Sequence, residues 1–164
     1  MGKAFLEEIR EAEIERLKND ESLRQLKPEM ISQMELENER ICYFPPKNGE
    51  ECKQKLIIMR GGKVTLTHFY YSGDFIGSDD DHREHSIEEW SVENEIVNSI
   101  YKRTLDDFKY FSELFTHDVG SWTLRLRIDN GECFERRCSR HTQPKMFSEY
   151  LRVMLNREDL YVCE

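Results

Sequence analysis

The sequence lacks any long apolar run, and this absence sets the first expectations. No stretch approaches the roughly 20 consecutive apolar residues that a membrane-spanning helix needs, so we expect no insertion into a membrane. The first 17 residues, MGKAFLEEIREAEIERL, also lack the apolar region of a signal peptide. We therefore expect a cytoplasmic protein whose five cysteines are reduced thiols, because disulfides persist mainly in oxidising compartments.

Several catalytic and cofactor-binding signatures are absent as well. The sequence contains no GxxxxGK[ST] phosphate loop, no GxGxxG dinucleotide fingerprint, no GxSxG nucleophile elbow and no HExxH zinc signature. These absences favour a protein without enzymatic activity and without a cofactor. A metal-dependent enzyme built on Asp/His or Cys/His clusters is therefore the least favoured of the three functional hypotheses that are set out below.

Charge is abundant but unevenly distributed. The chain carries 33 acidic and 24 basic residues, a formal net charge of −9. Residues 72–99 hold nine acidic side chains and one basic side chain, whereas residues 41–71 and 121–147 each have a surplus of three basic side chains. Such an acidic field disfavours nucleic acid and favours basic partners at long range.

An N-terminal helical arm is predicted. Residues 3–18 have apolar side chains at near-helical spacing, and the segment NDES that follows indicates a break. Pro28 suits the first position of a second, short helix. Three apolar residues would share one side of that helix: Met30, Ile31 and Met34. Such an arm can cover a sheet of its own chain or pack against a second copy, so a homodimer is one expectation.

A linker separates this arm from the rest of the chain. The segment FPPKNGEE contains two prolines and the Asn48-Gly49 turn signal. After it, the pattern changes from helical spacing to the alternation that is typical of β-strands. We therefore divide the chain into a helical arm with a Pro-containing linker over residues 1–50 and a domain over residues 51–164.

The second part of the chain has the pattern of an α+β domain. Two strand-like runs flank Gly61-Gly62, a two-residue hairpin signal, and IEEWSV indicates a third strand. Ser91 suits the N-cap of a helix that follows, and QPKMFSEYLRVML closes the domain as another helix. We predict an antiparallel sheet in the order β-hairpin, strand, helix, β-hairpin, helix, preceded by the helical arm.

The register of the second hairpin, WTLRLRIDNGECFERR, follows from its alternation. A three-residue Asp129-Asn130-Gly131 loop aligns the apolar residues of both strands, which a two-residue turn would not. It places Leu126 opposite Phe134 on the core face. Arg125 then lies opposite Glu135 on the outer face, a favourable cross-strand pair. We therefore predict a type I turn with the glycine in the left-handed bulge position.

The segment GSDDDHREH, residues 77–85, concentrates acidic charge beside two histidines. Counted from its first aspartate, the EF-hand pattern fails because Arg83 and Glu84 stand where the loop needs Asp and Gly. His82 and His85 are three residues apart, which places them on one face of a helix but on opposite faces of a strand. We interpret the segment as a solvated connection, with an acidic docking surface and a metal site as the alternatives.

A second group of metal-type side chains follows the second hairpin. It consists of Cys133, Cys138 and His141, with Cys163 as a conceivable fourth ligand. Structural zinc sites usually show two tight pairs, and only one loose pair exists here. In the predicted register the first two cysteines fall on opposite faces of one strand. We interpret them as small buried side chains rather than as ligands or nucleophiles.

Arginines of the second hairpin and just after it form a candidate anion-binding site. Its members are Arg125, Arg127, Arg136, Arg137 and Arg140. Such a surface can bind phosphates or a carboxylate-rich partner. Trp122 and Phe134 fall on the opposite face, so the aromatic side chains that single-strand binders interleave are missing from it. The alternative is that these arginines neutralise acidic residues of the same chain or of a second copy.

The leading functional hypothesis is protein–protein interaction through an acidic surface. Its candidate residues are Asp79, Asp80, Asp81, Glu84, Glu88 and Glu89. They would meet a protein partner with a basic surface, such as a defence nuclease or a regulator that this chain inhibits by mimicking phosphate charge. The second hypothesis is binding of nucleic acid or a phosphorylated ligand through the arginines, and the metal-dependent enzyme is the third.

Overall fold

The structure is a computed structural model, and it describes residues 2–40, 46–73, 84–111, 120–140, 142, 144 and 146–162. The elements are α1 (Gly2–Gln25), the 3-10 helix η1 (Pro28–Met30), β1 (Ile31–Glu39), β2 (Glu51–Met59), β3 (Lys63–Tyr70), β4 (His85–Ser91), α2 (Asn94–Phe108), β5 (Ser121–Ile128), β6 (Cys133–Ser139) and α3 (Phe147–Leu155). The strands form one antiparallel sheet in the order β4-β3-β2-β1-β5-β6. The predicted α+β class with an antiparallel sheet is confirmed.

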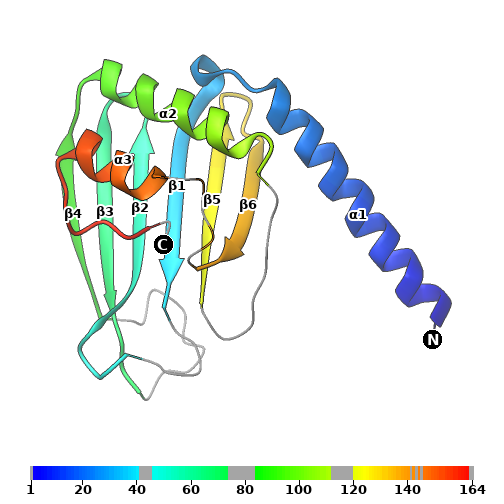
Figure 1. The fold of residues 1–164 in the computed structure, drawn as a ribbon, viewed down its shortest axis with the longest axis horizontal. Coiled ribbons are helices and arrows are strands. Elements are labelled where there is room, and N and C mark those ends of the chain that lie inside the picture. The colour runs from blue at the N-terminus through cyan, green and yellow to red at the C-terminus, as the bar shows by residue number, and fades with distance from the viewer. Residues whose placement is uncertain are drawn as a thin grey trace.

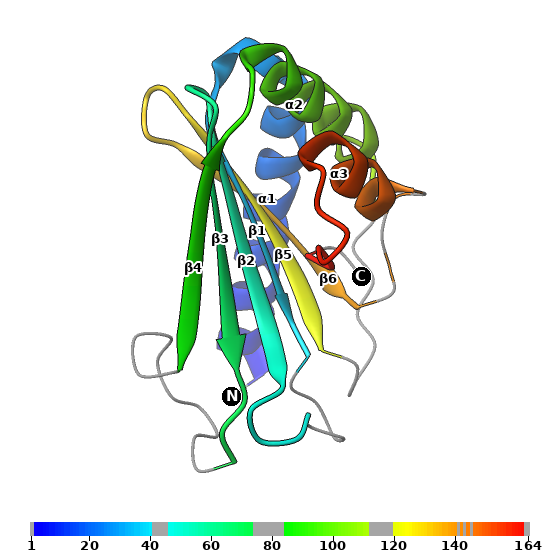
Figure 2. The ribbon, with the colours of Figure 1, turned by 90° about the vertical axis from the view of Figure 1, so that its left-hand side faces the viewer.

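The helices α2 and α3 lie on one face of the sheet. Figure 2 shows both on that side, and in Figure 1 α1 extends outward from the β6 edge. Buried leucines of four neighbouring strands pair across the sheet beneath the helices: Leu36, Leu56, Leu66 and Leu124. The fully buried Tyr101 of α2 donates a hydrogen bond to the carbonyl oxygen of Ile58 at 2.8 Å. This bond ties α2 to β2 in addition to the apolar packing.

The hairpin of β5 and β6 has the predicted register. Leu126 pairs with Phe134, and Arg125 pairs with Glu135. Gly131 has a φ of 89°, and its N–H donates to the carbonyl oxygen of Ile128 at 3.0 Å. The alternation of apolar and polar residues was sufficient to set this register because a slip of one residue would turn every apolar side chain outward.

The prediction of a second helix after Pro28 is wrong. Pro28 begins only a single 3-10 turn, and the following residues form β1, which pairs with β2 on one side and with β5 on the other. Met34 and Leu36 are buried on the helix-covered face, whereas the glutamates that alternate with them face the other way. This two-residue period was hidden by the helix-like spacing of Met30, Ile31 and Met34. β1 lies before the boundary predicted near residue 50 and pairs with strands beyond it.

The first helix also differs from its prediction. α1 does not break at NDES but continues to Gln25. Its last turns contact the sheet, because Leu23 is buried and Asp20 forms an ion pair with Arg136 of β6. In α2 the N-cap is Glu93 rather than Ser91. No helix in the described part of the chain is long and apolar enough to span a membrane.

Two glycines in the hairpin loops share a backbone conformation but not an environment. The β2–β3 hairpin has a three-residue loop, Arg60 to Gly62, instead of the predicted two-residue turn. Gly62 and Gly131 both have a φ of 89°. A Cβ at Gly62 would lie 2.3 Å from the carbonyl oxygen of Val92, just after β4, whereas a Cβ at Gly131 would meet no atom within 4 Å. Of these two hairpin glycines, Gly62 therefore combines the left-handed backbone with a close approach of another chain segment, and Gly131 does not.

We expect the two alanine variants to separate these effects. Gly131→Ala should lower the free energy of unfolding by about 1–2 kcal/mol, the penalty for a left-handed non-glycine residue. Gly62→Ala should lower it by more, since the new methyl group must also displace Val92. Urea denaturation of both variants measures the difference, and equal losses would contradict the close contact at Gly62.

Candidate interaction surface

The strand β4 is an edge of the sheet (Figure 1). It pairs with β3 along its whole length and is exposed at every residue except the half-buried Trp90. The side chain of Ile87 is 57% exposed, although isoleucine is among the residue types most often buried. The candidate acidic residues Glu88 and Glu89 belong to this strand, and Glu84 precedes it.

Acidic side chains continue along and beyond this edge. Residues 84–95 contain no lysine or arginine, and their five glutamates are all exposed: Glu84, Glu88, Glu89, Glu93 and Glu95. Among them, Glu84, Glu93 and Glu95 make no ion pair with any residue that the structure describes. We call β4 together with these glutamates the acidic edge. Asp79, Asp80, Asp81 and His82 lie outside the described residues.

Glu88 and Glu89 are consecutive strand residues, so their side chains lie on opposite faces of the sheet. On the face away from α2 and α3, Lys63 binds Glu89 with a distance of 2.8 Å between Nζ and Oε1. On the helix-covered face, Arg157 binds Glu88 with a distance of 2.6 Å between Nη2 and Oε2. The acidic edge therefore carries a carboxylate on each face of the sheet.

His68 lies at the centre of a charged cluster that sequence reasoning missed. The His68 cluster consists of Glu51, His68, Glu88, Arg157 and Asp159. One ring nitrogen, Nδ1, is hydrogen-bonded to the Glu51 carboxylate, and the other, Nε2, lies 2.9 Å from Oε2 of Glu88. Arg157 also binds Asp159 at 2.7 Å. The cluster thus joins β2, β3 and β4 to the segment after α3.

Only a weak signal in the sequence pointed to this cluster. His68 continues the alternation of Val64 and Leu66, which places it on the helix-covered face of β3. A histidine at such a position needs polar partners, because an unpaired buried polar group is costly. Those partners come from three other segments of the chain, and no local pattern connects them with His68.

Burial and neighbouring charges have opposite effects on the pKa of His68. Burial alone would lower it, but hydrogen bonds with Glu88 and Glu51 outweigh burial and raise the pKa above its ordinary value of 6.5. Arg157, and after it His68, lowers the pKa of Glu88 below its ordinary value of 4.5. The cluster is therefore held together best when His68 is protonated and the carboxylates are ionised.

The same cluster contains a group of metal-type ligands. Potential ligand atoms of His68, Glu88 and Asp159 lie within 4.8 Å of one another. The guanidinium group of Arg157, however, contacts both of these carboxylates. A metal ion would have to displace this arginine and compete with a proton on His68. The arrangement fits an ion-pair network better than a metal site.

The segment after α3 is also bound by backbone hydrogen bonds to Gln54. The buried Gln54 side chain donates to the carbonyl oxygen of Asp159 at 2.8 Å and accepts from the N–H of Tyr161 at 2.9 Å. Leu160 and Val162 are buried beside these contacts. Residues 159–162 are therefore packed onto the sheet next to the His68 cluster.

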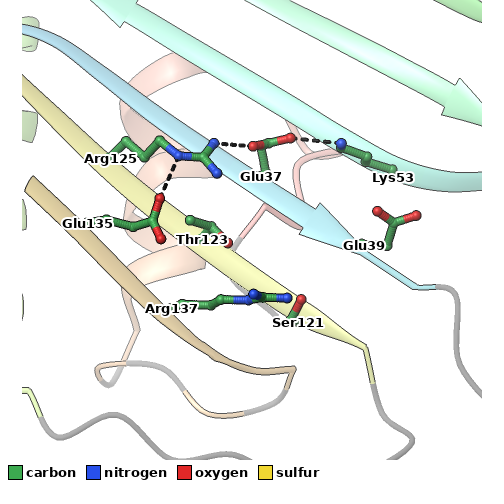
Figure 3. A pocket seen from close by; sticks show the side chains of 8 residues that line it. All are labelled: Glu37, Glu39, Lys53, Ser121, Thr123, Arg125, Glu135 and Arg137. Atoms are coloured by element: carbon green, nitrogen blue, oxygen red, sulfur yellow. Dashed lines mark hydrogen bonds and ion pairs between the residues drawn. The ribbon is translucent and has the colours of Figure 1, made fainter. Parts of the chain in front are cut away.

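The face of the sheet opposite α2 and α3 carries a network of ion pairs (Figure 3). Arg125 of β5 lies directly opposite Glu35 of β1 and Glu135 of β6, and it binds them at 2.7 and 2.8 Å. It also binds Glu37, which binds Lys53 of β2 at 2.8 Å. Burial alone would raise the pKa of Glu37, but hydrogen bonds from Lys53 and Arg125 lower it to about 2.

The other candidate arginines are distributed over both faces of the hairpin. Arg136 is buried on the helix-covered face and forms the ion pair with Asp20 of α1. Arg127 is exposed on the same face as Arg125, and Arg137 lines the polar pocket shown in Figure 3. Arg140 follows β6. The structure therefore brings three of the five arginines to one face, where Arg125 is already bound by three carboxylates.

The cysteines of the hairpin lie on opposite faces of β6. Cys138 is buried, as predicted, but Cys133 is exposed, so the prediction of two buried thiols is wrong for Cys133. Cys133 is the first residue of β6, next to the loop, on the sheet face that α2 and α3 do not cover. His141 and Cys163, the other members of the candidate zinc group, lie outside the described residues.

Comparisons with protein-family models, with curated proteins and with solved structures found no significant match. The features from which a function can be argued are therefore the chain's own. They are the acidic edge, the His68 cluster and the ion pairs of the open sheet face.

The His68 cluster predicts how stability depends on pH. Because the pKa of His68 is raised in the folded state, its contribution is fully present below pH 6.5 and is lost as the pH rises through the folded value. We expect the free energy of unfolding of the wild type to decrease as the pH rises above 6.5, and that of His68→Gln to decrease less. Urea denaturation between about pH 5.5 and pH 9 measures this difference, because this range covers the titration of a histidine with a raised pKa.

A histidine outside the cluster provides the control. His85 is exposed on β4, and its ring lies 5.8 Å from that of Phe69. The variant His85→Gln leaves every contact of the His68 cluster in place, so the part of the pH dependence that His68→Gln removes should remain. Identical pH profiles for the wild type and His68→Gln would contradict the role of the cluster.

Proposed function

We propose that the protein is an interaction module that binds a basic protein partner through its acidic edge. The observation that carries the proposal is the run of five exposed glutamates over residues 84–95, without a lysine or arginine, on and beside an open sheet edge. Asp79, Asp80 and Asp81 precede this run in the sequence and add to its negative charge. Complementary charge speeds encounter with a basic partner and excludes acidic ones.

The position of the acidic edge in the sheet supports this proposal. A central strand has neighbours on both sides that can neutralise its charges, as Glu37 of β1 shows with Lys53 and Arg125. An edge strand has a neighbour on one side only. Glu89 has Lys63 on β3, and no described strand pairs with the other side of β4. A basic surface supplies the missing charges.

The partner class that fits is a protein that itself binds nucleic acid. Such proteins carry clusters of lysine and arginine that neutralise phosphates. An acidic surface that binds this cluster competes with the nucleic acid, so the chain would act as an inhibitor of its partner. The arginines of β5 and β6 support direct nucleic-acid binding less well, because a phosphate would have to compete with the three carboxylates on Arg125.

We expect neutralisation of the acidic edge to weaken partner binding at least about tenfold. The test variant combines Glu84→Gln, Glu89→Gln, Glu93→Gln and Glu95→Gln and leaves Glu88 in the His68 cluster intact. Exposed charges contribute about 0.2–1 kcal/mol each, and about 1.4 kcal/mol corresponds to a factor of ten in affinity. The partner is captured at low salt from lysate of the source organism, with and without nuclease treatment. It is then identified, purified and titrated by calorimetry.

A matched control removes the same number of charges from the other end of the molecule. It carries glutamine at four exposed glutamates of α1: Glu7, Glu8, Glu11 and Glu15. This variant should bind like the wild type. A partner that binds the edge variant and the wild type equally would refute the proposal, and recovery of nucleic acid that disappears on nuclease treatment would favour the arginines instead.

A further inference from the structure

The backbone of β4 has hydrogen-bonding groups that point away from the sheet. The N–H of Tyr70 donates to the carbonyl oxygen of Glu84, and the N–H of Val92 donates to the carbonyl oxygen of Gly62, both at 2.9 Å. In an antiparallel ladder, pairs joined by hydrogen bonds alternate with pairs that are not. Positions 84 and 92 are both bonded to β3, so the even-numbered residues between them are bonded as well. The backbone groups of the odd-numbered Ile87 and Glu89 therefore point to the outer side of β4.

Apart from the glutamates of β4, the described part of the chain shows none of the usual features that block an added strand at this edge. Edge strands are commonly protected by proline, lysine, a β-bulge or a covering helix. β4 has the sequence HSIEEWS, without proline or lysine, and its pairing with β3 runs without a register shift. Among the described elements, none pairs with its outer side. At the opposite edge, by contrast, α1 contacts β6 through the ion pair of Asp20 and Arg136.

The charge of the edge decides which strand can be added. A second copy of β4 would bring a second set of glutamates against the first, and like charges across a strand pair are destabilising. A basic strand would instead place its side chains beside Glu89 on one face of the sheet and beside Glu88 on the other. The exposed Ile87 lies on the face of Glu89 and provides an apolar contact there. The edge is therefore unfavourable for self-pairing and complementary to a basic segment.

We propose that β4 binds an extended, basic segment of the partner as an additional strand of the sheet. The basic character of the segment rests on the proposed function, and the strand pairing rests on the outward backbone groups of Ile87 and Glu89. Backbone hydrogen bonds supply affinity that does not depend on the sequence of the segment, and alternate side chains supply selectivity. The segment carries lysine or arginine on both faces and an apolar residue beside Ile87.

The experiment compares two synthetic peptides of equal length and charge with the full-length chain. One peptide repeats the unit Lys-Lys-Val-Val, which places lysine and valine on both faces of a strand. The other has proline in place of each valine and cannot donate backbone hydrogen bonds at the proline positions. We expect the lysine–valine peptide to bind at least about tenfold more tightly at low salt, because only it forms the ladder. Calorimetry and fluorescence anisotropy measure both affinities.

Two substitutions of Ile87 separate the backbone from the side chain. Ile87→Pro removes an N–H that points to the outer side, so the ladder with β3 is retained and only the added strand is blocked. Ile87→Ala keeps this N–H and removes most of the apolar side chain. We expect Ile87→Pro to bind both peptides as weakly as the wild type binds the lysine–proline peptide. Ile87→Ala should still bind the lysine–valine peptide more tightly than the lysine–proline peptide.

Each outcome distinguishes the strand pairing from the acidic edge itself. If the wild type binds both peptides equally and salt weakens both, strand addition is refuted and the acidic edge stands. If neither peptide binds at low salt, both proposals fail. If Ile87→Pro does not fold, amide hydrogen exchange of the wild type tests the strand pairing instead. We expect the lysine–valine peptide to slow exchange at the N–H groups of Ile87 and Glu89. Unchanged exchange at these two positions refutes the pairing.

Discussion

The pairing of β1 with strands on both sides is the constraint on which the structure depends. β1 hydrogen-bonds to β2 and to β5, which are separated in the chain by β3, β4 and α2. Its apolar residues face the core beneath α2 and α3, and its glutamates face the opposite side. Without β1 the two hairpins would have no shared sheet, and α2 and α3 would lack the continuous apolar face that they cover.

The glutamates of β1 explain why the negative charge of the molecule is concentrated elsewhere. Glu35 and Glu37 are neutralised by Lys53, Lys55 and Arg125 on the neighbouring strands. Part of the basic surplus of residues 41–71 and 121–147 is therefore paired with these glutamates within the sheet. The acidic surplus of residues 84–95 has one neighbouring strand to balance it. The charge asymmetry in the sequence becomes an asymmetry between the centre and one edge of the sheet.

Local patterns in the sequence were sufficient for some elements and not for others. The register of β5 and β6 follows from alternation within sixteen residues, so it was predicted correctly down to the pairing of Arg125 with Glu135. β1 was mistaken for a helix because its partners lie in distant segments and because Pro28 and the methionines resemble a helix start. The His68 cluster was missed for the same reason: its charges come from four separate segments, and their proximity exists only after the sheet has formed.

The His68 cluster also bears on how the edge could act in recognition. Glu88 is held from the helix-covered side by His68 and Arg157, and Arg157 is held in turn by Asp159, whose backbone is bound by Gln54. These contacts keep β4 in register with β3 without using its outer backbone groups. An extended partner segment would then lose its own conformational freedom on binding but would not have to order β4. Preorganisation of this kind lowers the entropic cost of association, which matters most for a short strand with few hydrogen bonds to offer.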